Sequence, residues 1–141
     1  MIKNNQTLSL SVVIPVYNEQ QTIKTVIRTV SNSKIVNEIV IVDDCSVDNS
    51  VSIIKETIDK TLNEKTHLKI LFSQNKRNLG KGASLRAGFK LATCDLIVIQ
   101  DADLEYNPGE YERLIKPIID GNADVVYGCL LYTSPSPRDR G

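Results

Sequence analysis

The 141-residue sequence has no excess of charge of either sign, because it contains 17 Lys and Arg and 17 Asp and Glu. Nothing in this balance suggests a surface that binds nucleic acid. The sequence also has no run of about 20 apolar residues, so it shows no transmembrane helix. Residues 1–9 are polar and lack the apolar core of a signal peptide. The length is that expected of one domain.

Cysteine and histidine are scarce. The three cysteines, Cys45, Cys94 and Cys129, are not spaced as metal ligands. An odd and sparse set of this kind fits a reducing cytoplasm better than a disulfide scaffold. The single histidine, His67, lies in a polar stretch, where we expect an ordinary solvated side chain.

The sequence does contain a regular alternation of strand-like and helix-like segments. Apolar, β-branched runs predict strands, and apolar residues at helical spacing predict the helices between them. The predicted strands are Leu10–Val16, Glu38–Val42, Leu68–Phe72, Leu96–Ile99 and Asp124–Tyr127. Helices are predicted after Thr22 as a possible cap, from near Asp48, after Gly82, and between Pro108 and Gly121. This alternation predicts an α/β fold, a mostly parallel sheet with helices on both faces.

Polar side chains follow three of these strands at the point where each strand ends. The three clusters are Tyr17-Asn18-Glu19, Asp43-Asp44 and Asp101-Ala102-Asp103. The carboxyl ends of parallel strands open on one edge of the sheet, where such folds bind their ligands. We therefore expect the three clusters to lie close together.

Asp101 and Asp103 are one residue apart, and Glu105 stands just beyond them. Carboxylates packed this closely repel one another unless a cation lies between them. Mg²⁺ and Mn²⁺ prefer such oxygen ligands and commonly share them with a substrate phosphate. An isolated Asp-x-Asp is more often an acidic surface turn, so the prediction of a metal site depends on the neighbouring clusters.

The other polar residues have structural alternatives. Asp43-Asp44 could cap the following helix, and Glu19 could be an acid favoured by a helix dipole. Gly80-Lys81-Gly82 lacks the Walker spacing and the third glycine of a dinucleotide fingerprint. Lys81 at a helix N-terminus could still meet an anion, although a solvated lysine in a glycine-rich turn is an equally good interpretation.

The last thirteen residues, 129–141, differ from the rest, because hydrophobic periodicity stops and Pro135 and Pro137 appear. A disordered tail is one interpretation. Cys129–Asp139 also resembles the in-frame translation of a sequencing adapter, and we favour this second interpretation. The expected organisation is a polar N-terminal tail at 1–9, one α/β domain at 10–128 and a non-native tail at 129–141.

Four motifs taken together resemble family 2 glycosyltransferases of the GT-A fold, and most of all the polyprenyl-phosphate sugar transferases of the dolichol-phosphate mannosyltransferase type. The motifs are Ser11–Glu19, Ile41–Ser46, Asn78–Gly82 and Gln100–Glu105. The resemblance runs from about Leu10 to Gly128 and marks this stretch as the nucleotide-sugar-binding part of the domain. Two departures stand out. Cys45 replaces a usual glycine, and Gly128-Cys129-Leu130 replaces a usual Gly-Ser-Arg, which favours truncation near Gly128.

The resemblance implies roles for individual residues. Those expected to line the nucleotide-sugar pocket are Pro15, Tyr17, Glu19, Val42, Asp44, Lys81, Asp101, Ala102 and Asp103. Asp101, Asp103 and Glu105 would bind Mg²⁺ or Mn²⁺ at the donor diphosphate. Asp103 is also the one candidate catalytic base.

The implied reaction moves a hexose from a donor of the GDP-mannose or UDP-glucose type to a polyprenyl phosphate, with inversion, at the cytoplasmic face of a membrane. The sequence leaves the donor base, the sugar and the oligomeric state open. It also leaves open a glycan or protein acceptor, and a non-catalytic nucleotide-sugar-binding fragment. A receiver-type signalling domain would need its acidic pair after the first strand, whereas here the pair follows the second.

Overall fold

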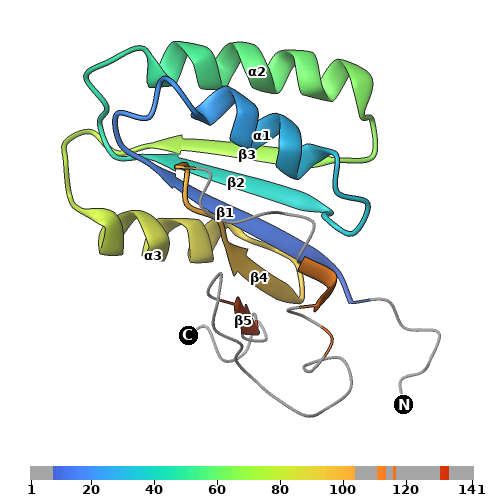
Figure 1. Cartoon of the computed structure of the whole chain (residues 1–141). Helices are drawn as coiled ribbons and strands as arrows, with labels where there is room; N and C mark the ends of the chain where they lie inside the picture. The colour runs from blue at the N-terminus through green and yellow to red at the C-terminus, as the bar shows by residue number, and fades with distance from the viewer. Residues whose placement is uncertain (1–7, 104–110, 114–115, 117–130, 134–141) are drawn as a thin grey trace.

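The computed structural model describes residues 8–103, 111–113, 116 and 131–133. Its elements are β1 (Leu10–Val16), α1 (Ile23–Ser31), β2 (Glu38–Asp43), α2 (Ser50–Glu64), β3 (Lys69–Gln74), α3 (Lys81–Leu91), β4 (Leu96–Ile99) and β5 (Leu131–Thr133). The sheet order is β3-β2-β1-β4-β5 (Figure 1). β1 to β4 pair in parallel, and β5 pairs antiparallel with β4.

The parallel α/β sheet that the sequence predicts is confirmed. Each of its first four strands lies within two residues of the predicted bounds. The predicted strand Asp124–Tyr127 lies outside the described residues, and of the helix predicted from Pro108 only 111–113 and 116 are described, all helical. Residues 131–133 belong to the segment set apart as non-native, and they lie against β4. The non-native origin of that segment stays a prediction.

The helices cover both faces of the sheet. α1 and α2 pack together over one face, and α3 lies over the other (Figure 1). On the first face, Leu10, Val12 and Ile14 of β1 meet the apolar side of α1. On the second face, Val13 of β1 packs with residues of α3. This alternation follows from the two-residue repeat of a strand, which sends successive side chains to opposite faces.

α3 approaches β1 closely at Gly88. A Cβ atom at this position would lie 2.5 Å from Cγ1 of Val13, which is closer than real Cβ contacts allow. The absence of a side chain therefore lets the helix backbone rest directly on the strand. This contact places the N-terminal end of α3 at the carboxyl edge of the sheet.

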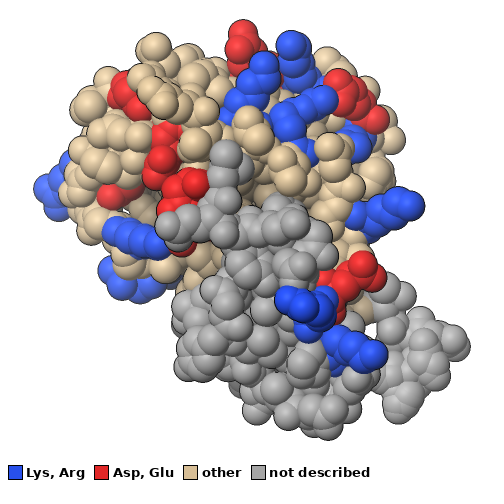
Figure 2. Space-filling model, in the orientation of Figure 1, with Lys and Arg blue, Asp and Glu red and all other residues tan. Residues whose placement is uncertain are grey.

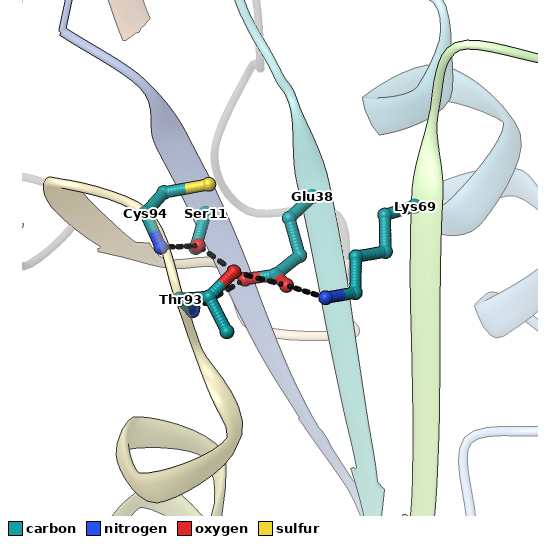
Figure 3. Close-up of polar contacts among 5 residues, drawn as sticks. All are labelled: Ser11, Glu38, Lys69, Thr93 and Cys94. Carbon is teal, nitrogen blue, oxygen red and sulfur yellow. Dashed lines mark hydrogen bonds and ion pairs between the residues drawn. The ribbon is translucent and has the colours of Figure 1, made fainter.

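A buried polar cluster lies at the opposite, amino edge of the sheet (Figure 3). The Glu38 side chain is fully buried, and its Oε1 accepts hydrogen bonds from Ser11 Oγ at 2.6 Å and Thr93 N at 2.8 Å. Its Oε2 accepts from Thr93 Oγ1 at 2.9 Å and lies 3.6 Å from Lys69 Nζ. Ser11 Oγ also accepts from Cys94 N at 3.3 Å. Glu38 thus joins three strands to the connection between α3 and β4.

Thr22 occupies the predicted N-cap position of α1, but its side chain makes no capping hydrogen bond. Its hydroxyl donates instead to the backbone carbonyl of Ala102. The predicted N-cap position is therefore confirmed without a capping hydrogen bond, and Thr22 links the start of α1 to the acidic segment after β4. None of the helices in the described part of the chain is long and apolar enough to span a membrane.

Candidate nucleotide-sugar site

A cavity of about 430 Å³ opens at the carboxyl edge of the sheet, and its size is within the usual range for ligand pockets. It is lined by Pro15, Val16, Tyr17, Glu19, Asp44, Asn78, Gly80, Lys81, Ser84, Asp101, Ala102 and Asp103. Figure 2 shows acidic side chains gathered on the left of the molecule, with basic side chains beside them over α3. The structure thus brings together residues from four separate segments of the chain.

Eight of the nine residues predicted for the pocket line this cavity. The exception is Val42, which is fully buried and belongs to the apolar cluster on the α3 side of the sheet. Glu105, the third predicted metal ligand, lies outside the described residues. Four residues that line the cavity were not predicted as site residues: Val16, Asn78, Gly80 and Ser84. The Asn78–Gly82 turn leading into a helix could have indicated the last three, because Ser84 lies in the first turn of that helix.

The loops after β1 and β2 are held together by hydrogen bonds from backbone N–H groups to side-chain oxygens. Asn18 has a left-handed φ of 53° and donates its N–H to Ser46 Oγ at 2.8 Å. Its side-chain Oδ1 accepts from Val47 N at 2.9 Å, and Glu19 N donates to Ser50 Oγ at 2.9 Å. These bonds leave the side chains of Tyr17 and Glu19 on the cavity side.

Glu19 is half-buried and faces other carboxylates. Burial raises the pKa of its carboxyl group, and the negative charges of Asp103, Asp101 and Asp48 raise it further. A hydrogen bond with Thr22 acts in the opposite direction. The cavity therefore has a negative potential that favours the entry of a cation.

Asp44 is 4% exposed, and the structure uses both of its carboxylate oxygens. Oδ1 accepts hydrogen bonds from Leu79 N at 2.8 Å and Asn75 Nδ2 at 2.9 Å, and Oδ2 accepts from Gly80 N at 2.9 Å. Burial alone would raise its pKa, but these three hydrogen bonds outweigh burial and lower it. Asp44 therefore stays ionised and fixes the loop before α3.

A carboxylate has about four acceptor positions, so Asp44 keeps one position for a ligand in the cavity. The predicted contact with the base or ribose is compatible with this geometry and stays a prediction. The alternative that Asp43-Asp44 caps α2 is not found. Asp43 accepts instead from Ser46 N at 2.9 Å and from Ser46 Oγ at 2.6 Å, closing the turn after β2.

A buried hydrogen bond holds the start of the acidic segment that follows β4. Gln100 is 1% exposed, and its Oε1 accepts a hydrogen bond of 2.6 Å from the fully buried Tyr111 hydroxyl. The following residue, Asp101, is partly exposed and forms an ion pair with Lys81, whose Nζ lies 2.6 Å from Oδ1. Asp103 is exposed at the same rim.

The carboxylates at this rim offer oxygen ligands, the kind that Mg²⁺ and Mn²⁺ prefer. Within the described residues, no group of three or more His, Cys, Asp or Glu side chains is close enough together to hold a metal ion. Asp101 and Asp103 fit a cation that is held by two carboxylates and completed by substrate phosphates. The Lys81 ammonium already lies where a positive charge is stabilised.

Residues 11–141 match the sequence profile of glycosyl transferase family 2, and the chain belongs to this family. The resemblance found in the sequence is thereby confirmed. One relative is the undecaprenyl-phosphate 4-deoxy-4-formamido-L-arabinose transferase of Yersinia enterocolitica, 34% identical over 125 residues. The match covers 86% of this chain and 37% of the relative, so the chain spans about a third of that protein's length.

Solved structures of similar fold include S. aureus TarS, with a TM-score of 0.72 and 19% identity over 94% of this chain and 29% of TarS. The mannosyltransferase PcManGT of Pyrobaculum calidifontis, solved with GDP-Man and Mn²⁺, gives a TM-score of 0.63 and 24% identity. That match covers 70% of this chain and 28% of PcManGT. At such identities the likeness establishes the GT-A-type α/β fold alone.

Proposed function

We propose that the protein takes part in the transfer of a sugar from a nucleoside diphosphate sugar to a polyprenyl phosphate, with inversion at the anomeric carbon. The observation that carries the proposal is the cavity at the carboxyl edge, with Asp101 and Asp103 at its rim and Lys81 beside them. The family relationship and the lipid-phosphate acceptor named for the Yersinia relative support it.

In this proposal the donor lies across the cavity. Tyr17, which is 46% exposed, offers a flat apolar face to the base, and the free acceptor position of Asp44 receives a base or ribose hydrogen. The diphosphate lies toward the first turn of α3, where backbone N–H groups and Lys81 favour an anion. Guanosine and uridine donors are both compatible with these contacts.

Asp101, Asp103 and Glu105 would hold a divalent cation, Mg²⁺ or Mn²⁺. When bound there, the cation would neutralise charge that builds on the departing diphosphate. The PcManGT complex with GDP-Man and Mn²⁺ supports this choice of cofactor. The chain's own residues orient the donor, since Gln100 and Thr22 fix the segment that carries both aspartates.

A phosphate acceptor is already anionic at neutral pH, so the reaction needs no strong general base. Asp103 stays the candidate for any proton transfer that a hydroxyl acceptor would require. A polyprenyl acceptor places the reaction at a membrane surface. The sugar named for the Yersinia relative is a substituted pentose, so the proposal is not restricted to a hexose.

The test is calorimetric titration of GDP-mannose and UDP-glucose into the purified protein, with and without Mn²⁺. Asp101→Ala and Asp103→Ala should each weaken the metal-dependent affinity at least about 100-fold, because each removes a charged ligand. Asp59→Ala, which removes an exposed carboxylate on α2, is the matched control and should bind as the wild type does.

Unchanged affinity in both rim variants would contradict the proposed metal site. Metal-dependent binding that is never followed by sugar transfer to a polyprenyl phosphate would instead identify a nucleotide-sugar-binding unit without turnover. The two results separate the binding step of the proposal from its chemical step.

A further inference from the structure

Lys81 differs from the other cations near it. Residues 75–92 contain five basic side chains and no acidic one, and all five are exposed. Among the residues that the structure describes, Lys81 is the one member of this group with an ion pair. The other four are Lys76, Arg77, Arg86 and Lys90.

Hydrogen bonds fix the backbone on both sides of the ion pair between Lys81 and Asp101. Asp44 fixes the backbone N–H groups of Leu79 and Gly80, directly before Lys81, and Gly80 has a left-handed φ of 97°. On the other side, Asp101 follows Gln100, whose backbone N–H donates to the carbonyl of Val13 at 2.9 Å. The ion pair, with 2.6 Å between Lys81 Nζ and Asp101 Oδ1, links these two fixed segments across the cavity rim.

The ion pair uses an oxygen that a metal ion would need. Asp101 Oδ1 is occupied by the ammonium, and a second cation at the same carboxylate would lie within about 4 Å of the first. A divalent cation and an ammonium at that distance repel each other, and the repulsion is stronger where solvent is excluded. The ammonium and a divalent cation therefore compete for Asp101.

We propose that Lys81 is the resident counter-ion of Asp101, that a divalent cation displaces it, and that the released ammonium then pairs with the donor diphosphate. This inference rests on the proposed function, because it assumes the metal site at Asp101 and Asp103. It adds that metal and diphosphate bind cooperatively. The metal frees the cation that the diphosphate needs, and by reciprocity the diphosphate strengthens metal binding.

The net charge at the cavity rim also indicates that metal and diphosphate bind cooperatively. With Lys81 on Asp101, the group formed by Lys81, Asp101 and Asp103 has a net charge of −1, which repels a diphosphate. Once a divalent cation enters, the same group has a net charge of +1 and attracts the diphosphate. Glu19, which faces both aspartates, makes the metal-free state still less favourable to an anion.

The test is a titration of Mn²⁺ alone, followed by electron paramagnetic resonance, with no nucleotide present. Lys81→Met should bind Mn²⁺ about three- to tenfold more tightly than the wild type, because no ammonium has to be displaced. Lys81→Arg keeps the charge and should retain the wild-type affinity within about twofold. Lys90→Met, on the exposed last turn of α3, is the matched control and should leave Mn²⁺ binding unchanged.

The second measurement is the affinity for UDP and GDP at saturating Mn²⁺. Lys81→Met should weaken this affinity about three- to tenfold, opposite in sign to its effect on Mn²⁺. A merely structural role for Lys81 would weaken both, and circular dichroism of each variant checks that it is folded.

Two results would overturn the inference, and they are distinguishable. If the wild type binds Mn²⁺ and Lys81→Met binds it equally or less tightly, Lys81 is not a competing counter-ion, although the metal site stands. If neither protein binds Mn²⁺, the metal-dependent function proposed above fails, and the role of Lys81 fails with it.

Discussion

Carboxylates at the two edges of the sheet differ in their burial and in their bonding partners. At the amino edge, Glu38 is fully buried and accepts hydrogen bonds from three strongly fixed donors (Figure 3). At the carboxyl edge, the Asp101 carboxylate forms an ion pair with the exposed side chain of Lys81. A buried carboxylate with fixed donors stabilises the fold, whereas an exposed one beside a displaceable cation can exchange its partner for a ligand.

Asp44 lies between these extremes. It stands at the carboxyl edge and lines the cavity, yet it is bonded almost as completely as Glu38. Its hydrogen bonds hold the loop that carries Lys81. Some carboxylates therefore build the site, and others would bind the donor. Substitutions at each edge can test this distinction.

The largest effect is expected at the amino edge, from Glu38→Ala. The change leaves the Ser11 hydroxyl and both Thr93 donors without their acceptor and opens a cavity, so we expect a loss of about 3–5 kcal/mol in the free energy of unfolding. The measurement is urea denaturation followed by circular dichroism. Below the denaturation range, Mn²⁺ affinity should be unchanged.

Lys69→Met is the control for the ionic part of this cluster. The Lys69 side chain is 56% exposed and lies 3.6 Å from the Glu38 carboxylate, so its removal should cost less than about 1 kcal/mol. Selective loss of Mn²⁺ affinity in Glu38→Ala, with stability intact, would break the distinction between the two edges.

Glu38 also illustrates what the sequence could not reveal. The strands and helices were predictable because hydrophobic periodicity is local and repeats every two or three to four residues. Glu38 stood only as the first residue of a predicted strand, since its partners Ser11 and Thr93 lie 27 and 55 residues away. No local pattern marks a buried carboxylate whose donors are that distant.

The candidate site was predictable to the extent that topology determines it. Parallel strands bring their carboxyl ends to one edge, so clusters at 17–19, 43–44 and 101–103 could be expected to meet. The partner of each side chain was not predictable. The bonds of Asp44 to the loop before α3 and the contact between Lys81 and Asp101 depend on where α3 docks, which the close approach at Gly88 determines.

An intermediate effect is expected for Asp44→Asn, which keeps the shape of the side chain and removes its charge. One amide cannot accept from all three donors, so stability at neutral pH should fall by about 1–3 kcal/mol. The pKa of Asp44 in the folded protein lies below the ordinary value of an aspartate, because its three hydrogen bonds outweigh its burial. Its stabilising contribution is therefore present above that value and is lost as pH falls through the lower, folded-state pKa.

The measurement is the urea midpoint of wild type and Asp44→Asn between about pH 3 and pH 7, the range over which such carboxylates titrate. The acid side of the stability profile should be less steep in the variant. Some slope should remain, because hydrogen bonds also lower the pKa of Asp48 in spite of its burial. Equal slopes would mean that the charge of Asp44 does not stabilise the folded protein. Asp44 could then not be counted among the residues that build the site.

The smallest effect, a gain, is expected from Cys45→Gly in the turn beside Asp44. Cys45 has a φ of 63°, a left-handed conformation that costs a residue with a Cβ about 1–2 kcal/mol. Glycine removes that strain but adds freedom to the unfolded chain, so we expect a net stabilisation of about 0.5–1 kcal/mol in urea denaturation. Val47→Gly, in the same loop without a positive φ, should instead lose stability. A loss in Cys45→Gly would mean that the contact of Cys45 Sγ with the Lys76 carbonyl, at 3.7 Å, outweighs the strain. The gain we expect would mean that the carboxyl edge, unlike the amino edge, is held in a conformation less stable than the chain could reach.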